Sequence, residues 1–161
     1  MSRIGAGVVE VSLEAVRPHE LAVHALRSAG AAGVAIDLDP LVSGLVIHVD
    51  KRRMERVIVN LVENAETHGG GIVRLAIEAD GTRVRFAVED RGPGVPPDER
   101  ERIFEPFVRG RAAGRRGSAD GTGLGLALVA EHVRILGGRV WAQDRPGGGA
   151  RFVVELPASS P

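Results

Sequence analysis

Two runs of alternating apolar and polar residues, joined by an Asp-Gly pair, constrain the fold of this chain more than any other feature of its sequence. The runs cover residues 72–79 and 82–90, and Asp80-Gly81 lies between them. Alternation with a period of two is typical of a strand with one buried face, and Asp-Gly is a favoured hairpin turn. The sequence therefore predicts an antiparallel hairpin over residues 72–90 with one face against a hydrophobic core.

Asp90 stands on the apolar face of this hairpin, where a core residue is expected. The other members of that face in the second run are Val84, Phe86 and Val88. An unpaired carboxylate is costly to bury, and the glycines that follow in Asp90-Arg-Gly92-Pro-Gly94 allow another molecule to approach the backbone closely. Two interpretations stay open at this point: Asp90 binds a donor group of a ligand, or it caps the turn after the strand.

The remaining segments alternate between helical and extended patterns. We expect strands over residues 8–13, 34–38, 45–49, 139–143 and 151–156, with 34–38 and 45–49 forming a second hairpin. We expect helices from Pro18 to the glycines at 30 and 33, and over residues 51–68, 97–105 and 124–136, with a loop over 109–121. Asp50 can cap the helix over 51–68. Because helices alternate with hairpins, the predicted fold class is α+β. It is a two-layer α/β sandwich whose mixed, mostly antiparallel sheet carries helices on one face.

Composition limits the classes of protein to which the chain can belong. Its 161 residues predict one domain over 1–156 and a disordered tail over 157–161. Lys and Arg together number 21, as do Asp and Glu, so no overall charge favours nucleic acid or an anionic membrane surface. There is no cysteine, which excludes disulfides and thiolate chemistry. No apolar run approaches the roughly 20 residues of a membrane span, so we expect no membrane contact by this segment itself.

The helix expected over residues 51–68 carries two asparagines beside its apolar stripe. Asn60 and Asn64 are four residues apart and therefore lie on one side of the helix, where they can line a pocket between helix and sheet. Glu63 projects away from the stripe and is interpreted as a solvated charge. Two asparagines on a helix are common, so this pattern alone is weak.

A glycine-rich segment leads into the helix expected over residues 124–136. Gly121-Thr-Gly-Leu-Gly125-Leu has the loop-to-helix character that holds phosphates on backbone amides, although a loop that only caps the helix is equally compatible. Neither the dinucleotide fingerprint nor the Walker loop fits it. Before it, Phe104 and Phe107 are followed by a basic stretch from Arg109 to Arg116, a composition that suits a lid over a triphosphate.

The order of these motifs is more specific than any one of them. Asn60-Leu-Val-Glu-Asn64-Ala, Asp90-Arg-Gly-Pro-Gly94, Phe104-Glu-Pro-Phe107 and Gly121-Thr-Gly-Leu-Gly125-Leu follow one another along the chain. This series resembles the N, G1, F and G2 boxes in the catalytic ATP-binding domain of two-component sensor histidine kinases, members of the GHKL or Bergerat superfamily. Residues 147–152, Gly-Gly-Gly-Ala-Arg-Phe, resemble the terminal glycine motif of that domain. The resemblance covers residues 8–156 and implies the Bergerat α/β sandwich.

The resemblance implies a role for each matching residue. Asp90 would accept a hydrogen bond from the adenine amino group, and Gly94 would let the base approach. Asn64 would hold Mg²⁺ that bridges the phosphates of ATP, with Asn60 beside it, and Arg109 would be a lid cation. The full set of implied nucleotide contacts is Asn60, Asn64, His68, Asp90, Gly92, Gly94, Val95, Phe107, Arg109, Thr122, Gly123, Leu124, Gly125 and Leu126. Within it, Asn60, Asn64 and Arg109 are the expected catalytic residues.

The implied partners are the dimerisation domain that carries the phosphoacceptor histidine of the same kinase and, through it, a response regulator. The domain would lie in the cytoplasm, in a parent protein anchored in the membrane. Two positions depart from the family pattern. Thr67 stands where a lysine is often found, which puts one phosphate contact in doubt, and His68 stands where a tyrosine is common.

Three alternatives were weighed against a kinase. Superfamily members that hydrolyse ATP carry Glu at the position of Asn60 as a general base, a role that Asn cannot fill. A regulatory module that only binds nucleotide is the second alternative, and the intact lid sequence and Asn64 argue against it. The third is that His19, in His19-Glu-Leu21, is itself the phosphoacceptor. We reject it because the interval to Asn60 is too short for a dimerising helical hairpin.

Overall fold

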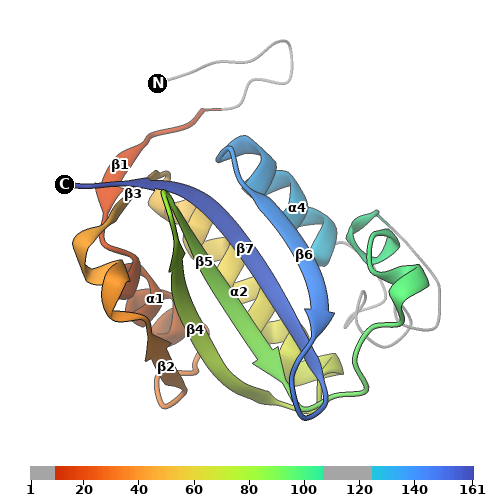
Figure 1. The fold of residues 1–161 in the computed structure, drawn as a ribbon. Helices are drawn as coiled ribbons and strands as arrows, with labels where there is room; N and C mark the ends of the chain where they lie inside the picture. The colour runs from red at the N-terminus through yellow and green to blue at the C-terminus, as the bar shows by residue number, and fades with distance from the viewer. Residues whose placement is uncertain (1–9, 107–124) are drawn as a thin grey trace.

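The computed structural model describes residues 10–106 and 125–161, which form a curled sheet with helices packed on one face (Figure 1). The order of strands across the sheet is β1-β3-β7-β5-β4-β2, and β6 also pairs with β7. The strands are β1 (Glu14–Val16), β2 (Ala35–Leu38), β3 (Val46–Val49), β4 (Ile72–Asp80), β5 (Arg83–Asp90), β6 (Arg139–Asp144) and β7 (Ala150–Ser159). All pairs are antiparallel except β2 with β4, which confirms the predicted fold class.

The helices α1 (Pro18–Ser28), α2 (Lys51–His68) and α4 (Gly125–Ile135) form the second layer. Asp50 caps α2 by accepting hydrogen bonds from the backbone N–H groups of Arg52 and Arg53, as its position before the helix suggested. The apolar stripe of α2 is buried against the sheet, and Glu63 is exposed on the other side, as predicted. Its central place between α1 and α4 makes α2 the main scaffold for any site between the layers.

The hairpin of β4 and β5 is confirmed over its whole length, with Asp80 opposite Arg83. The turn is displaced by one residue from the expected Asp80-Gly81: its two central positions are Gly81, with φ of +63°, and Thr82. Since Asp80 remains in register with its partner, the hairpin keeps the predicted inward face of β5. Asp90 ends that face and is fully buried.

Several expected elements are wrong. Segments 34–38 and 45–49 form strands but no hairpin, because β2 pairs in parallel with β4 while β3 pairs with β1 and β7. Of the strand expected over residues 8–13, residues 10–13 form no continuous strand, residues 8 and 9 lie outside the described residues, and β1 begins at Glu14. Residues 97–105 form two short 3₁₀ turns, η2 (Pro97–Glu99) and η3 (Arg102–Phe104). A third 3₁₀ turn, η1 (Pro40–Gly44), connects β2 to β3. The tail expected at 157–161 is shorter, because β7 extends to Ser159, which pairs with Val46.

The face of the sheet opposite the helices is covered by ion pairs rather than by another layer. A central row of apolar side chains, Ala76, Ala87, Val153 and Trp141, lies across four strands in register. On one side of this row, Glu89 accepts hydrogen bonds from Arg74 and Arg151. On the other, Glu155 accepts from Arg85 at 2.8 Å and Arg139 at 3.1 Å. The long arginine side chains therefore cover the apolar row, and their charges range from exposed, at Arg139, to buried, at Arg151.

These pairs make the stability of the fold depend on pH. Burial alone raises the pKa of Glu89, but hydrogen bonds from Arg74 and Arg151 outweigh it and hold the pKa below the ordinary value. Glu155 behaves in the same way beside Arg85 and Arg139. Because these pKa values are lower in the folded chain than in the unfolded chain, their contribution to stability is complete at neutral pH. It is lost as the pH falls through the folded-state pKa values.

We predict that Glu89→Gln lowers the free energy of unfolding by about 2 kcal/mol at pH 7, since it leaves buried arginine charge without its main partner. The matched control is Glu78→Gln, which removes another partner of Arg151 but at a side chain that is 47% exposed; we expect a loss below about 1 kcal/mol. Urea titrations between pH 7 and pH 4 measure both, and the deficit of Glu89→Gln shrinks as the pH falls. Equal losses for the two variants, or a deficit independent of pH, would contradict this account.

Among the residues that the structure describes, no helix is both long and apolar enough to cross a lipid bilayer.

Candidate functional site

The carboxylate of Asp90 is held in a fixed orientation at the end of β5. Its side chain is fully buried, and Oδ1 accepts hydrogen bonds from the backbone N–H groups of Gly92 and Ala150, both at 2.9 Å. The bond from Gly92 is the turn cap that one interpretation of the sequence predicted, and the bond from Ala150 comes from the start of β7. Asp90 therefore has protein partners, contrary to its first appearance as an unpaired acid. Two amides on one oxygen also fix the direction of the other oxygen.

Two glycines from distant parts of the chain approach Asp90 closely. A Cβ atom on Gly149 would lie 2.0 Å from the backbone oxygen of Asp90, and one on Gly69 would lie 2.5 Å from Oδ2. Gly149 also has φ of +96°, a conformation that glycine adopts without strain. The sequence signal for Gly149 was its place in the terminal glycine motif. No signal identified Gly69, which ends α2 and accepts a hydrogen bond from the N–H of Arg91 at 2.9 Å.

The asparagines of α2 lie at the end of the helix that meets Asp90. Asn64 is 7% exposed, and within the described residues neither its amide oxygen nor its amide nitrogen has a hydrogen-bond partner. The amide nitrogen of Asn60, one turn earlier, is likewise buried with no partner in the described part of the chain. Buried polar atoms are nearly always paired in native proteins, so two such amides on one helix face point to a ligand or ordered water. His68, one further turn along, is half-buried.

The loop after Asp90 closes one side of the site. Gly94 has φ of +79° and packs against Gly149, whose carbonyl oxygen would lie 3.6 Å from a Cβ at position 94. Gly92 is half-buried, and Val95 is buried as a member of the hydrophobic core. Farther along, Phe104 packs edge-on against Phe152 of β7, with ring centroids 6.2 Å apart. Phe104, the first of the two aromatic residues before the basic stretch, therefore anchors this segment to the sheet.

The start of α4 lies toward the end of α2 that carries Asn64 (Figure 1). Arg53, near the start of α2, contacts His132 in the second half of α4, so the two helices run antiparallel. Gly125 is the first residue of α4 and is exposed, and Leu126 is buried. The other sequence-predicted residues, Phe107, Arg109, Thr122, Gly123 and Leu124, lie outside the described residues.

The positions of these groups define what the site can bind. At one end, the Asp90 carboxylate can accept from a donor such as an amino group. In the middle, the amide oxygen of Asn64 is a hard oxygen donor of the kind that Mg²⁺ prefers. At the other end, the first backbone N–H groups of α4 have no partner within the helix, and such groups favour negative charge. A ligand with an amino-bearing base and a chain of phosphates matches this series.

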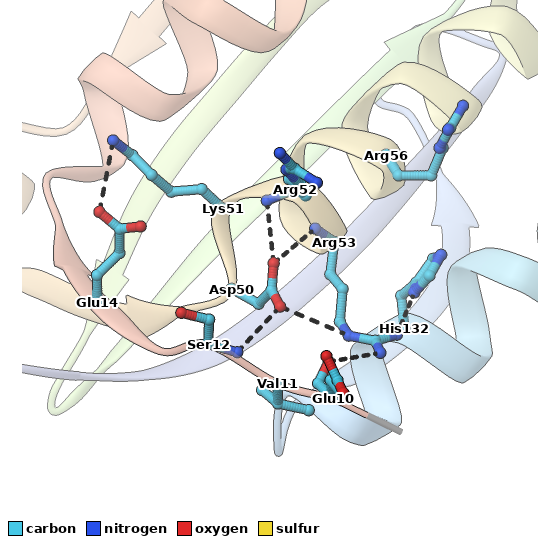
Figure 2. Close-up of a pocket in the computed structure, with 10 residues that line it drawn as sticks. All are labelled: Glu10, Val11, Ser12, Glu14, Asp50, Lys51, Arg52, Arg53, Arg56 and His132. Atoms are coloured by element: carbon cyan, nitrogen blue, oxygen red, sulfur yellow. Dashed lines mark hydrogen bonds and ion pairs between the residues drawn. The ribbon is translucent and has the colours of Figure 1, made fainter. Parts of the chain in front are cut away.

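A pocket of about 760 Å³ lies at the opposite end of α2 from Asn64 (Figure 2). There the guanidinium of Arg53 donates to the carbonyl oxygen of Glu10 at 3.2 Å and to Nδ1 of His132 at 3.1 Å. Burial and the charges of neighbouring arginines lower the pKa of His132, which favours the neutral ring that accepts this bond. These contacts join the incoming segment of the chain to α2 and α4, away from Asp90.

Comparisons with known proteins agree with the geometry. The family described as "Histidine kinase-, DNA gyrase B-, and HSP90-like ATPase" matches residues 49–160. The alginate biosynthesis sensor protein KinB of Pseudomonas aeruginosa is 46% identical over an alignment 114 residues long, which covers 69% of this chain and 18% of KinB. The sensor histidine kinase MtrB of Mycobacterium leprae is 39% identical over an alignment 162 residues long, gaps included, which covers 98% of this chain and 29% of MtrB.

Among solved structures, the crystal structure of full-length ShkA in complex with AMPPNP has a TM-score of 0.72 and 36% identity to this chain. The match covers 95% of this chain and 32% of that one. This chain thus spans less than a third of the length of each of these three proteins.

Proposed function

Since the chain belongs to the histidine kinase-, DNA gyrase B- and HSP90-like ATPase family, we propose that it binds ATP with Mg²⁺ and donates the γ-phosphate to a histidine. The acceptor histidine lies on the dimerisation domain of a sensor kinase. In this proposal the chain is the catalytic domain of a longer, membrane-anchored protein, in which it lies in the cytoplasm. A response regulator receives the phosphate from the dimerisation domain in turn.

The observation that carries this proposal is the buried amide of Asn64, which has no hydrogen-bond partner among residues 10–106 and 125–161 and lies on the helix end that meets the fixed carboxylate of Asp90. A hydrophobic core would not retain an amide with both polar atoms unsatisfied, since each costs about 1–3 kcal/mol. A metal-bound triphosphate would give the amide of Asn64 the partner that it lacks among the described residues, and an adenine amino group could donate to the neighbouring carboxylate of Asp90. The similarity to ShkA, which was solved with AMPPNP, supports the same choice of ligand.

The residues of this chain act by positioning. Asp90 orients the base, Gly94 and Val95 line the loop beside it, and Asn64 with Asn60 faces the phosphates. A bound Mg²⁺ would neutralise phosphate charge. In the transfer, the bond from the γ-phosphorus to the bridging oxygen breaks, a bond to the acceptor imidazole nitrogen forms, and the imidazole loses a proton. Phosphoryl transfer needs little beyond such alignment and charge neutralisation.

Transfer of radiolabel from [γ-³²P]ATP to a separately produced helical hairpin from a sensor kinase tests this function. We expect label on the acceptor histidine, none after its replacement by alanine, and little free phosphate. An amide at position 60 cannot serve as a general base for water, so steady phosphate release without an acceptor would instead indicate an ATPase. Nucleotide binding with neither transfer nor hydrolysis would indicate a regulatory module.

We predict that Asn64→Ala weakens the binding of Mg²⁺-AMPPNP by about 10- to 100-fold, the worth of one interaction with a charged group. The variant should bind AMPPNP in EDTA much as the unaltered chain does, because the lost interaction is through the metal. Glu63→Ala is the matched control, since its exposed side chain neighbours Asn64 on the far side of α2. An equal loss with and without Mg²⁺ would contradict the assignment of Asn64 to the metal.

A further inference from the structure

We infer that Arg100 is a positioning residue for the nucleotide base, because it fastens the loop after Asp90 to the β6–β7 turn. Its Nε donates to the carbonyl oxygen of Val95 at 3.0 Å, and one terminal nitrogen donates to Oδ1 of Asp144 at 2.8 Å. The inference rests on the proposed function, since it concerns the same site.

The loop after Asp90 is attached to the β6–β7 strand pair at both of its ends, and Arg100 makes the second attachment. Asp144 is the last residue of β6 and pairs with Ala150, the residue whose N–H donates to Asp90. At one end of the loop, Asp90 binds Gly92 and Ala150. At the other end, Arg100 binds Val95 and, through Asp144, the same strand pair. The loop has no regular secondary structure between Gly92 and Val95. The position of Val95 relative to the carboxylate of Asp90 therefore depends on both attachments.

The chemistry of the guanidinium suits this task. It presents several N–H groups in a rigid plane, so Arg100 can reach a carbonyl on its own segment and a carboxylate on another strand at the same time. A lysine has the charge but only a single ammonium at the end of a flexible chain. Asp144 is 79% exposed, so the ion pair itself contributes little to folding. We therefore expect the loss of Arg100 to affect the position of the loop more than the stability of the domain.

The test is calorimetric titration of the 161-residue chain and its variants with ADP and with GDP. For Arg100→Ala we expect the Kd for ADP to rise about tenfold, consistent with two lost hydrogen bonds, and the preference for ADP over GDP to fall. Arg100→Lys should recover part of the affinity. Arg102→Ala is the control for charge, since Arg102 is exposed and within the described residues its side chain makes no hydrogen bond or ion pair; it should bind as the unaltered chain does. The thermal midpoint of each variant without nucleotide should stay within about 2 °C of the unaltered chain.

The outcomes separate the inference from the proposed function. If the unaltered chain binds ADP and Arg100→Ala binds it equally well, the inference is wrong and the proposed function stands. If Arg100→Ala and Arg100→Lys lower the thermal midpoint and the affinity together with unchanged ADP preference, the residue is merely structural and the inference is again wrong. If the unaltered chain binds no ADP, the proposed function fails and the inference with it.

Discussion

Asp90→Asn is expected to weaken the binding of adenine nucleotides by about 100-fold or more, because it places a donor where the adenine amino group must donate. The structure makes this expectation sharper than the sequence could. Oδ1 of Asp90 accepts from two backbone amides, so the amide oxygen of an asparagine takes that position and its NH₂ group takes the position of Oδ2. The hydrogen bonds from Gly92 and Ala150 are kept, and only the group that points toward the base changes, from an acceptor to a donor.

The measurement is calorimetry with ADP and GDP, together with thermal unfolding of the free protein. The affinity for ADP should fall sharply, the affinity for GDP should change little, and the free protein should unfold at nearly its original temperature. Equal loss of both nucleotides together with a lower midpoint would show a folding defect and would remove Asp90 from base recognition. Asp98→Asn, on the exposed surface of η2, makes the same chemical change outside the predicted site.

Among glycine-to-alanine substitutions near the site, Gly149→Ala is expected to cause the largest loss of stability. The new Cβ would stand 2.0 Å from the backbone oxygen of Asp90, and the residue would have to keep φ of +96°. The start of β7 must then move away from β5, which removes the N–H of Ala150 from Asp90. We expect a loss of about 3 kcal/mol or more in the free energy of unfolding, together with loss of nucleotide binding.

Gly148→Ala separates the two causes of this effect. Gly148 has φ of +113°, so an alanine there is strained in the same way, but no atom lies within 4 Å of its Cβ position. It should lose only about 1–2 kcal/mol and retain most of the nucleotide affinity. Urea denaturation of both variants gives the comparison. If the two variants lose the same stability, the close contact with Asp90 has no energetic importance.

Local patterns predicted the elements whose partners are near in sequence. The β4–β5 hairpin follows from alternation and a turn, and α2 follows from its stripe and the cap at Asp50. The supposed hairpin of 34–38 and 45–49 was wrong because the parallel pairing of β2 with β4 joins residues nearly forty apart, such as Ala35 and Arg74. No local turn signal encodes that choice. The extension of β7 to Ser159 depends in the same way on the distant strand β3.

The candidate site was predictable to a similar extent. Asp90 was conspicuous because a charged residue continued an apolar face, and its burial is confirmed. The sequence signal for Asn64 was weak by itself, and only the order of the motifs along the chain made this residue a candidate ligand. Gly69, Arg100 and Asp144 were missed because their importance lies in contacts that the fold creates, such as the 44-residue separation between Arg100 and Asp144. The expected lid residue Arg109 lies outside the described residues and stays a prediction.

The most direct test of the central claim is an isothermal titration of the unaltered chain with AMPPNP in the presence of Mg²⁺. The account predicts saturable binding of one nucleotide per chain below millimolar concentration, weaker binding in EDTA, and competition that is much stronger by ADP than by GDP. Absence of binding at millimolar nucleotide, or equal binding of adenine and guanine nucleotides, would contradict the assignment of Asp90 and Asn64 to a nucleotide site.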